Sequence, residues 1–138
     1  MTFRYMLDSN IISNLIRNDA NVVRRVASVE MASLCISSIV EGEIRYGLAK
    51  RPEARRLALI VGEFLKRVET VPWDSSAAKH YGELRTRLEK RGHVLSTLDM
   101  LIAAHALSLN LTLVTCDKAF LSIERLLAED WTKENAKR

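Results

Sequence analysis

Short apolar runs alternate along this chain with longer stretches in which apolar residues recur every three or four positions. The short runs predict buried strands and the longer stretches predict helices. Strands are expected at 3–7, 33–36, 68–71 and 111–115, with an additional edge strand near 125–127. Helices are expected at 11–17, 21–30, 38–50, 52–67, 75–91 and 97–109. Strands that alternate with helices predict an α/β fold in which helices cover both faces of a mostly parallel sheet.

Polar residues and a proline indicate where several helices begin. Ser9 or Asn10 can cap the helix that follows the first strand. Ser38, with Glu41 three residues later, has the spacing of a capping box. Pro52 suits the first turn of its helix.

Two other residues indicate where helices end. Gly92 and Asn110 each follow a helical stretch, and both residue types readily adopt the left-handed conformation that ends a helix. We therefore expect the helices that precede them to stop at these positions.

The composition is that of one small globular domain. The chain has 138 residues, of which 48% are hydrophobic, and this suffices for a single core. We expect this domain to span 1–131 and the polar tail 132–138 to fray. The sequence contains no run of about 18 apolar residues, so it predicts no membrane span. Its first residues lack the apolar stretch of a secretory signal. A cytoplasmic protein that does not contact a membrane is expected.

Charge and cysteine content narrow the function classes only a little. The net charge of +4 permits contact with a polyanion without requiring it. Cys35 and Cys116 lack the spacing of a zinc site, so we expect two reduced, largely buried thiols. The three histidines are too widely spaced to predict a histidine-based metal site.

Four acidic residues are expected near the carboxyl ends of the strands, where parallel sheets bind their ligands. Asp8 directly follows the first strand, and Asp117 follows the strand at 111–115. Glu43 lies early in the helix after the second strand. Asp99 lies in the first turn of the helix that leads into 111–115, and it joins the others if that turn meets the same edge.

Gathered carboxylates would repel one another strongly in a partly desolvated site. A divalent cation removes this repulsion, and Mg²⁺ or Mn²⁺ prefers hard oxygen ligands of this kind. Such an ion can activate a water and stabilise charge on a phosphate. The acidic residues therefore indicate a metal-dependent nuclease.

Each acid also has a structural interpretation. Asp8 could form only a turn or a cap, although an acid placed directly after buried residues favours function. Asp99 could be the third helical residue of a capping box with Ser96, and Asp117 could be a turn residue. For these last two residues both interpretations remain open.

Glu41 and Glu43 are distinguished by their helical positions. Glu41 is accounted for as the partner of Ser38 in the capping box. Glu43 lies about 200° around the helix from it and borders the apolar face. An acid at that border needs a partner, and a shared metal would provide one.

Other polar and aromatic side chains receive structural interpretations. We expect Arg45 to form a surface ion pair rather than to contact phosphate. We expect Trp73 and Trp131 to be packing residues rather than stacking platforms for bases.

Four segments, taken in order, resemble the motifs of VapC-like PIN domains. The segment MLDSN (6–10) is similar to the opening LDTN motif, with Ser9 in place of the usual threonine. The segment SSIVEGEIRYG (37–47) resembles the second motif, whose essential glutamate falls on Glu43. The segment LDMLIAAHAL (98–107) resembles the third motif, whose aspartate falls on Asp99. The segment LVTCD (113–117), followed by Phe120, resembles the fourth motif, whose acidic position falls on Asp117. One motif alone is weak, but four in order from about residue 4 to Trp131 are specific.

The resemblance implies a PIN-like three-layer α/β sandwich and a toxic endoribonuclease of a toxin–antitoxin pair. A Mg²⁺ or Mn²⁺ ion would be held by Asp8 and Asp99, with Glu43 and Asp117 completing the site. Asn10 and Thr115 would support the site by hydrogen bonds. The implied substrate is structured RNA, often tRNA, and the implied partner is a VapB-like antitoxin that inhibits a homodimeric toxin.

Three other classes fit this pattern less well. A haloacid-dehalogenase-like phosphatase needs a second acid two residues after the first, where this chain has Asn10. A receiver-like signalling domain needs an acidic pair after the first strand, but Asp8 stands alone, and Lys118 is poorly placed for its essential lysine. A non-catalytic PIN-like binding module would be favoured by loss of a carboxylate, and all four are present.

Overall fold

The computed structural model, which describes residues 2–134, has one parallel sheet at its centre. Its five strands lie in the order β3-β2-β1-β4-β5, and every strand pairing is parallel, which confirms the expected α/β architecture. The strands are β1 (Tyr5–Leu7), β2 (Leu34–Ser37), β3 (Glu69–Val71), β4 (Thr112–Val114) and β5 (Ala128–Glu129).

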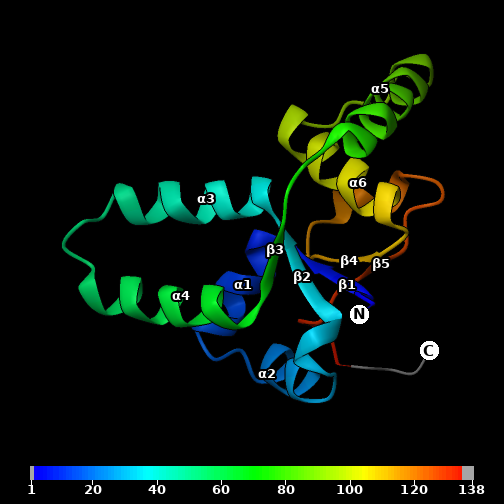
Figure 1. The fold of residues 1–138 in the computed structure, drawn as a ribbon. Coiled ribbons are helices and arrows are strands. Elements are labelled where there is room, and N and C mark those ends of the chain that lie inside the picture. Colours follow the sequence, from blue (N-terminus) through cyan, green and yellow to red (C-terminus); the bar gives the residue numbers. More distant parts are fainter. Residues whose placement is uncertain (1, 135–138) are drawn as a thin grey trace.

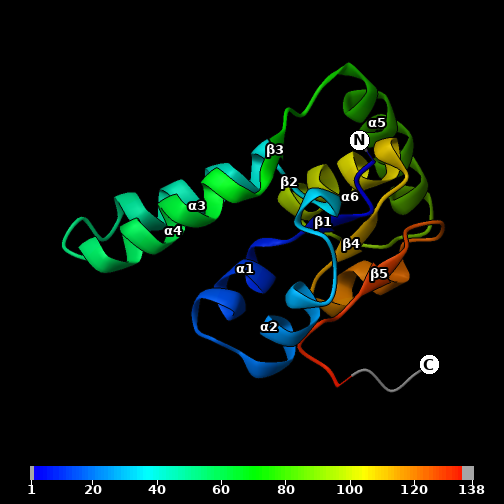
Figure 2. The ribbon, with the colours of Figure 1, turned by 60° about the horizontal axis from the view of Figure 1, so that its bottom comes forward.

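The helices are distributed around this sheet (Figure 1). Helices α1 and α2 lie on one side, α5 and α6 lie on the other, and α3 and α4 form a hairpin that extends beyond β3 (Figure 2). No helix within residues 2–134 is both long and apolar enough to cross a membrane. The helices are α1 (Ser9–Ile16), α2 (Ala20–Ala27), α3 (Ser38–Ala49), α4 (Arg55–Arg67), α5 (Ser75–Lys90) and α6 (Thr97–Leu109), with short 3₁₀ turns η1 (Met31–Ser33) and η2 (Lys118–Ser122).

The middle strand and α6 supply much of the core. All three residues of β1 are buried, because helices cover both faces of a parallel sheet. In α6, buried residues occur on consecutive positions from Ile102 to Ala106, so this helix is enclosed on most sides. Three small alanines in that stretch allow close approach to neighbouring elements.

The expected ends of two helices are confirmed. Gly92 and Asn110 have φ angles of 67° and 57°, the left-handed conformation that ends a helix. After α5, the His93 amide donates to the Leu88 carbonyl and the Gly92 amide donates to the Glu89 carbonyl, which satisfies carbonyls that have no partner within the helix.

Two predicted helix starts are wrong. The side chain of Asp8, rather than Ser9 or Asn10, caps α1, and the helix begins at Ser9 instead of at residue 11. Ser37, rather than Ser38, caps α3 by accepting from the Ile39 amide. The predicted capping box is absent because Ser37, the last residue of β2, takes the capping position and Ser38 is already the first residue of the helix.

Other boundaries differ by a few residues. Helix α4 begins at Arg55, so Pro52 lies in the preceding turn rather than in the first helical turn. Helix α2 ends at Ala27 instead of at residue 30, because η1 takes the chain into β2. The edge strand is 128–129 rather than 125–127, and β1 begins at Tyr5 rather than at residue 3. Local pattern locates an element better than it locates its ends, because tertiary hydrogen bonds set the ends.

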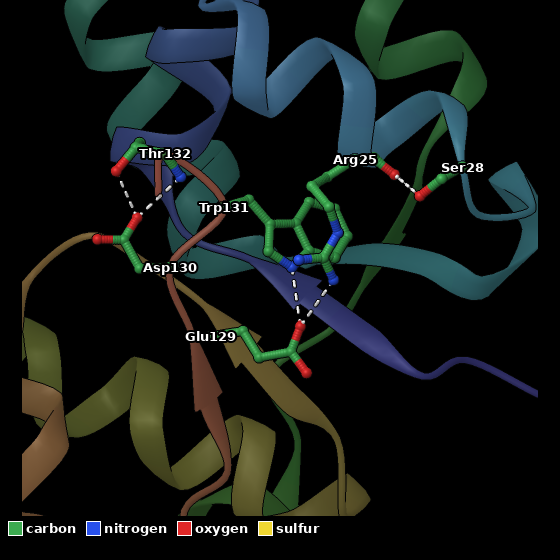
Figure 3. A network of polar contacts seen from close by, with 6 residues as sticks. All are labelled: Arg25, Ser28, Glu129, Asp130, Trp131 and Thr132. Atoms are coloured by element: carbon green, nitrogen blue, oxygen red, sulfur yellow. Dashed lines mark hydrogen bonds and ion pairs between the residues drawn. The ribbon is translucent and has the colours of Figure 1, made fainter. Parts of the chain in front are cut away.

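The segment after β5 is held against α2 by Trp131 (Figure 3). Trp131 is 0% exposed, its indole Nε1 donates to Glu129 at 2.9 Å, and Arg25 lies over its ring. Arg25 also forms an ion pair with Glu129. The Asn21 side chain donates to the Thr132 carbonyl, so this residue of the predicted tail is bonded to the domain. Residues 135–138 of that tail lie outside the described part of the chain.

Candidate active site

Asp8 lies where β1 passes into α1, and its carboxylate is almost fully enclosed. It is 4% exposed. One carboxylate oxygen accepts from the Ser9 amide at 2.8 Å, and the other accepts from the Thr115 hydroxyl at 2.8 Å. Asn10 also donates to the second oxygen, at 3.2 Å. Asp8 therefore both caps α1 and belongs to a polar cluster, so its structural and functional interpretations are compatible.

Asn10 and Thr115 join the ends of the two central strands. The Asn10 side chain donates to the Thr115 hydroxyl at 3.2 Å and accepts from the Cys116 amide at 3.1 Å. The Thr115 hydroxyl also accepts from the Asp117 amide at 3.0 Å. These bonds connect the β1 and β4 ends through side chains, and they hold the backbone of Asp117 beside Asp8.

Glu43 lies in the second turn of α3, half-buried beside α1. Its Oε1 atom is buried and has no hydrogen-bond partner within the described residues. A buried acceptor without a partner is costly, so such atoms commonly mark a ligand site. This unpaired oxygen supports the choice of Glu43 over Glu41.

Glu41 has a role, but not the predicted one. Its carboxylate accepts from Arg45 at 2.8 Å, one helical turn further along α3. The surface ion pair expected for Arg45 is therefore present, whereas the predicted cap contact of Glu41 is absent because Ser37 caps the helix.

Asp99 lies in the first turn of α6, which runs antiparallel to the strands because it leads into β4. Its helix therefore begins at the carboxyl edge of the sheet, which is the condition for Asp99 to join the other acids. Ser96 caps the helix by accepting from the Asp99 amide at 3.1 Å. This cap uses the backbone of Asp99, and the Asp99 carboxylate is half-buried.

Asp117 is the most exposed of the four acids. Its carboxylate accepts from the Ala119 amide at 2.9 Å and so caps η2. The turn role considered for Asp117 is present, while its backbone is tied to Thr115.

Electrostatic coupling brings these acids together as one cluster. Burial raises the pKa of Asp8, and the charges of Asp99 and Asp117 raise it further, against the lowering effect of the Thr115 and Ser9 hydrogen bonds. Burial also raises the pKa of Glu43, with added contributions from the charges of Asp8 and Asp99. The pKa of Asp99 is raised by burial and by the charge of Asp117. Each of these acids therefore feels the charge of at least one other.

The cluster offers the hard oxygen donors that Mg²⁺ and Mn²⁺ prefer. In residues 2–134, no group of three or more histidine, cysteine, aspartate or glutamate side chains is arranged so that it could hold a metal ion. The coupled charges and the unpaired Oε1 of Glu43 nevertheless fit a cation, because both unfavourable features would be relieved by a positive charge.

Within the described residues, neither cysteine side chain forms a hydrogen bond or a disulfide at this site. Both are free thiols; Cys35 is buried as expected, whereas Cys116 is only partly so. Burial, with a smaller effect of Glu69, raises the pKa of the Cys35 thiol to about 12, so this thiol is unreactive.

The two tryptophans are packing residues, as expected. Trp73 packs against Tyr81, and Trp131 packs against Tyr5.

The sequence analysis assigned no role at the acidic cluster to three residues that lie around it: Ser9, Ser37 and His105. Ser9 lies next to Glu43, where its side chain lowers the pKa of that carboxyl. Ser37 caps the helix that carries Glu43, and it contacts the buried His105 of α6. The two adjacent serines, Ser37 and Ser38, were the available signal, but sequence alone does not tell which one caps the helix.

The PIN domain family model matches residues 5–126 of this chain. Ribonuclease VapC2 of Rickettsia felis is 36% identical over 132 residues, covering 94% of this chain and 98% of the relative. The tRNA(fMet)-specific endonuclease VapC of Shigella flexneri is 32% identical over 130 residues, covering 94% of this chain and 98% of that protein.

A solved structure agrees with the sequence matches. DNA-bound VapBC from Salmonella typhimurium contains a chain that superposes with a TM-score of 0.87 at 33% identity, covering 94% of this chain and 98% of the other. All four acids of the cluster lie within the span that the family model matches. The chain therefore belongs to the PIN-domain family, as a homologue of the VapC ribonucleases.

Proposed function

We propose that this protein is a toxic, metal-dependent endoribonuclease that cleaves structured RNA and is neutralised by a VapB-like antitoxin. The observation that carries this proposal is the coupled acidic cluster, with the buried, unpaired Oε1 of Glu43 beside Asp8. A binding surface for RNA alone gains nothing from four acids at one edge, because they repel phosphate. A hydrolytic site does gain from them once a cation is bound.

Asp8 and Asp99 would be the main ligands of a Mg²⁺ or Mn²⁺ ion. Glu43 would share the ion directly or through a water, and Asp117 would complete the site. When bound, the ion would lower the pKa of a water and offset negative charge on the phosphate.

The remaining steps are carried out by side chains of the chain itself. Thr115, Asn10 and the Ser9 amide orient the Asp8 carboxylate and favour its ionised form. Glu43 presents an acceptor oxygen that has no hydrogen-bond partner within the described residues. The raised pKa of its carboxyl group suits Glu43 to take a proton from the attacking water. Attack of that water on phosphorus breaks the bond to the leaving oxygen, which takes up a proton.

The proposed substrate is tRNA. The relative in Shigella flexneri is named for cleavage of tRNA(fMet), and it covers nearly the whole chain. The net charge of +4 favours approach of a polyanion to a protein that carries an acidic site.

The proposed antitoxin contact is a groove beside the acidic cluster. A groove of about 580 Å³ lies between α1, α3 and α4. Its lining includes Glu43 of the acidic cluster and apolar side chains such as Ile12 and Ile44. Three basic residues also line it: Arg17, Lys50 and Arg51. A peptide segment with an apolar face could lie along it and reach the acids. The similar Salmonella typhimurium structure is that of a VapBC assembly, which supports such a partner, and we propose a homodimer for the toxin.

The test is cleavage of total tRNA by the purified protein with Mg²⁺ or Mn²⁺, compared with EDTA and with Asp99→Asn. We expect discrete fragments that require both the metal and Asp99. Glu41→Gln is the matched control, because Glu41 is an acid on the neighbouring helix α3 that pairs with Arg45.

Two results would contradict this proposal. Cleavage that persists in EDTA or in Asp99→Asn would exclude the proposed metal site. Tight binding of tRNA without cleavage under either metal, in protein free of antitoxin, would instead indicate a non-catalytic binding module.

A further inference from the structure

The start of α3 is joined directly to α6 by a buried hydrogen bond. The Ser37 hydroxyl and His105 Nδ1 lie 2.8 Å apart, and both residues are essentially inaccessible, at 0% and 1% exposed. The same hydroxyl oxygen accepts from the Ile39 amide at 3.0 Å and so caps α3. One serine therefore both begins α3 and contacts α6.

A second route joins the same two helices through the segment between β3 and α5. The Ser38 hydroxyl accepts from the Trp73 amide at 3.0 Å. The Trp73 indole then donates to the Leu101 carbonyl of α6 at 2.9 Å. Adjacent serines at the end of β2 are thus bonded to α6 by a direct and an indirect path.

In the direct path, the bond between Ser37 and His105 can be assigned a donor and an acceptor. Burial lowers the pKa of His105, and the opposing effects of Asp74 and the Pro72 carbonyl are smaller, so the imidazole is neutral near neutral pH. The Ser37 oxygen accepts from the Ile39 amide, and we assign the Ser37 proton to the bond with Nδ1. In this assignment the ring proton of His105 is on Nε2.

This connection lies between the helices that carry two of the proposed metal ligands. Glu43 follows Ser37 by six positions on α3, and Asp99 precedes His105 by six positions on α6. Six helical residues span about 9 Å, so each acid lies about 9 Å along its helix from the bond. A rotation or slide of α3 against α6 would therefore change the separation of the two carboxylates.

We propose that Ser37 and His105 are positioning residues, whose hydrogen bond, together with the Trp73 bridge, sets the placement of Glu43 relative to Asp99. The inference rests on the proposed metal-dependent cleavage. Both residues are buried, and they act by holding α3 against α6.

The test compares three variants that each remove one bond of the connection. Ser37→Ala removes the hydroxyl, His105→Leu removes the ring nitrogens, and Trp73→Phe removes the indole donor at a half-buried position. Ser33→Ala is the control, because Ser33 is a buried serine just before β2 whose hydroxyl bonds to the Glu30 carbonyl, outside the connection.

Three properties are measured for each folded variant: Mn²⁺ affinity without RNA, kcat and KM for tRNA cleavage, and Tm. For the three connection variants we expect Mn²⁺ affinity and kcat to fall about 10- to 100-fold, with KM nearly unchanged. Ser33→Ala should lower Tm alone. Trp73→Phe keeps the test available if the two fully buried changes prevent folding.

A purely stabilising role would give a different pattern. If the three connection variants lower Tm as Ser33→Ala does, while keeping wild-type Mn²⁺ affinity and kcat, the positioning role is excluded. If the wild-type protein itself neither binds Mn²⁺ nor cleaves tRNA, the proposed function fails first. Nitrogen-15 NMR of the wild-type imidazole should show the proton on Nε2, and a proton on Nδ1 would overturn the assigned direction of the Ser37 bond.

Discussion

The Thr115 hydroxyl donates to the Asp8 carboxylate at 2.8 Å, although the two residues are 107 positions apart in the chain. The same hydroxyl accepts from the Asn10 side chain and from the Asp117 amide. One threonine at the end of β4 therefore holds the acid at the end of β1 and the backbone of a second acid. This arrangement follows from the parallel pairing of β1 with β4, which brings both strand ends to the same edge.

Thr115→Val tests this relationship, because valine keeps the shape and removes the hydroxyl. We expect a loss of about 1–3 kcal/mol in the free energy of unfolding, since the buried Asp8 oxygen loses a donor. We also expect cleavage to fall about 10- to 100-fold, as is typical when a metal ligand loses its supporting bond. Urea unfolding and tRNA cleavage measure the two effects.

Thr86→Val is the control for this change. Thr86 lies on the exposed face of α5, where its hydroxyl donates to the Gly82 carbonyl. This variant should cleave at the wild-type rate. Equal cleavage by both valine variants would mean that the Thr115 hydroxyl does not support the site.

Asp8→Asn should abolish cleavage. Without metal, the stability of this variant relative to wild type should also increase as pH rises. Burial and neighbouring acids raise the folded-state pKa of Asp8, so the folded protein binds protons more tightly than the unfolded chain. Stability from this group is therefore fully present below its unfolded pKa and is lost as pH rises through the raised folded pKa. The asparagine variant lacks this loss, so its stability relative to wild type should increase as pH rises above about 4. Thermal unfolding in EDTA at a series of pH values measures the difference.

Asp19→Asn controls for the loss of a negative charge at a helix cap. Asp19 caps α2 by accepting from the Val22 amide, much as Asp8 caps α1, but it is not among the charges that act on Asp8. This variant should retain cleavage. If Asp8→Asn cuts tRNA at the wild-type rate, the assignment of Asp8 to the metal site is wrong.

Glu43→Gln should lose at least about 10-fold in cleavage, whereas Glu41→Gln should cut nearly as well as wild type. The substituted amide would present a neutral group where the proposed mechanism needs a charged acceptor. Glu41 pairs with Arg45 on the surface, and loss of such a pair changes stability by less than about 1 kcal/mol. Cleavage rates and Tm for the two variants make the comparison, and equal loss of activity would contradict the separation of the two glutamates.

Trp131 should contribute to stability chiefly through its volume. Trp131→Ala should cost about 3–5 kcal/mol in the free energy of unfolding, because it leaves a cavity under Arg25 and beside Tyr5. Trp131→Phe should cost less, since it removes only the indole donor to Glu129 and some contact area (Figure 3). Urea unfolding measures both, and an equal cost would mean that the Glu129 bond, rather than packing, dominates.

Local pattern in the sequence was sufficient for the order and type of nearly all elements. Alternating apolar runs and amphipathic stretches predicted the strand and helix succession, and Gly92 and Asn110 predicted two helix ends because left-handed φ angles favour these residue types. The positions of Asp8 and Asp117 after strands were enough to predict that they share a sheet edge, since parallel strands end together.

Tertiary structure decided what a residue contacts across the sheet and between helices. Whether Ser37 or Ser38 caps α3 depended on how far β2 stays paired with β3, and the bond from Ser37 to His105 depended on α6 packing at that point. Spacing in the sequence reveals neither contact, because the partner of Ser37 in β3 lies 34 positions away and His105 lies 68 positions away. The sequence alone determined which acids this protein has and on which elements they lie, while only the packed fold decided which polar groups hold them.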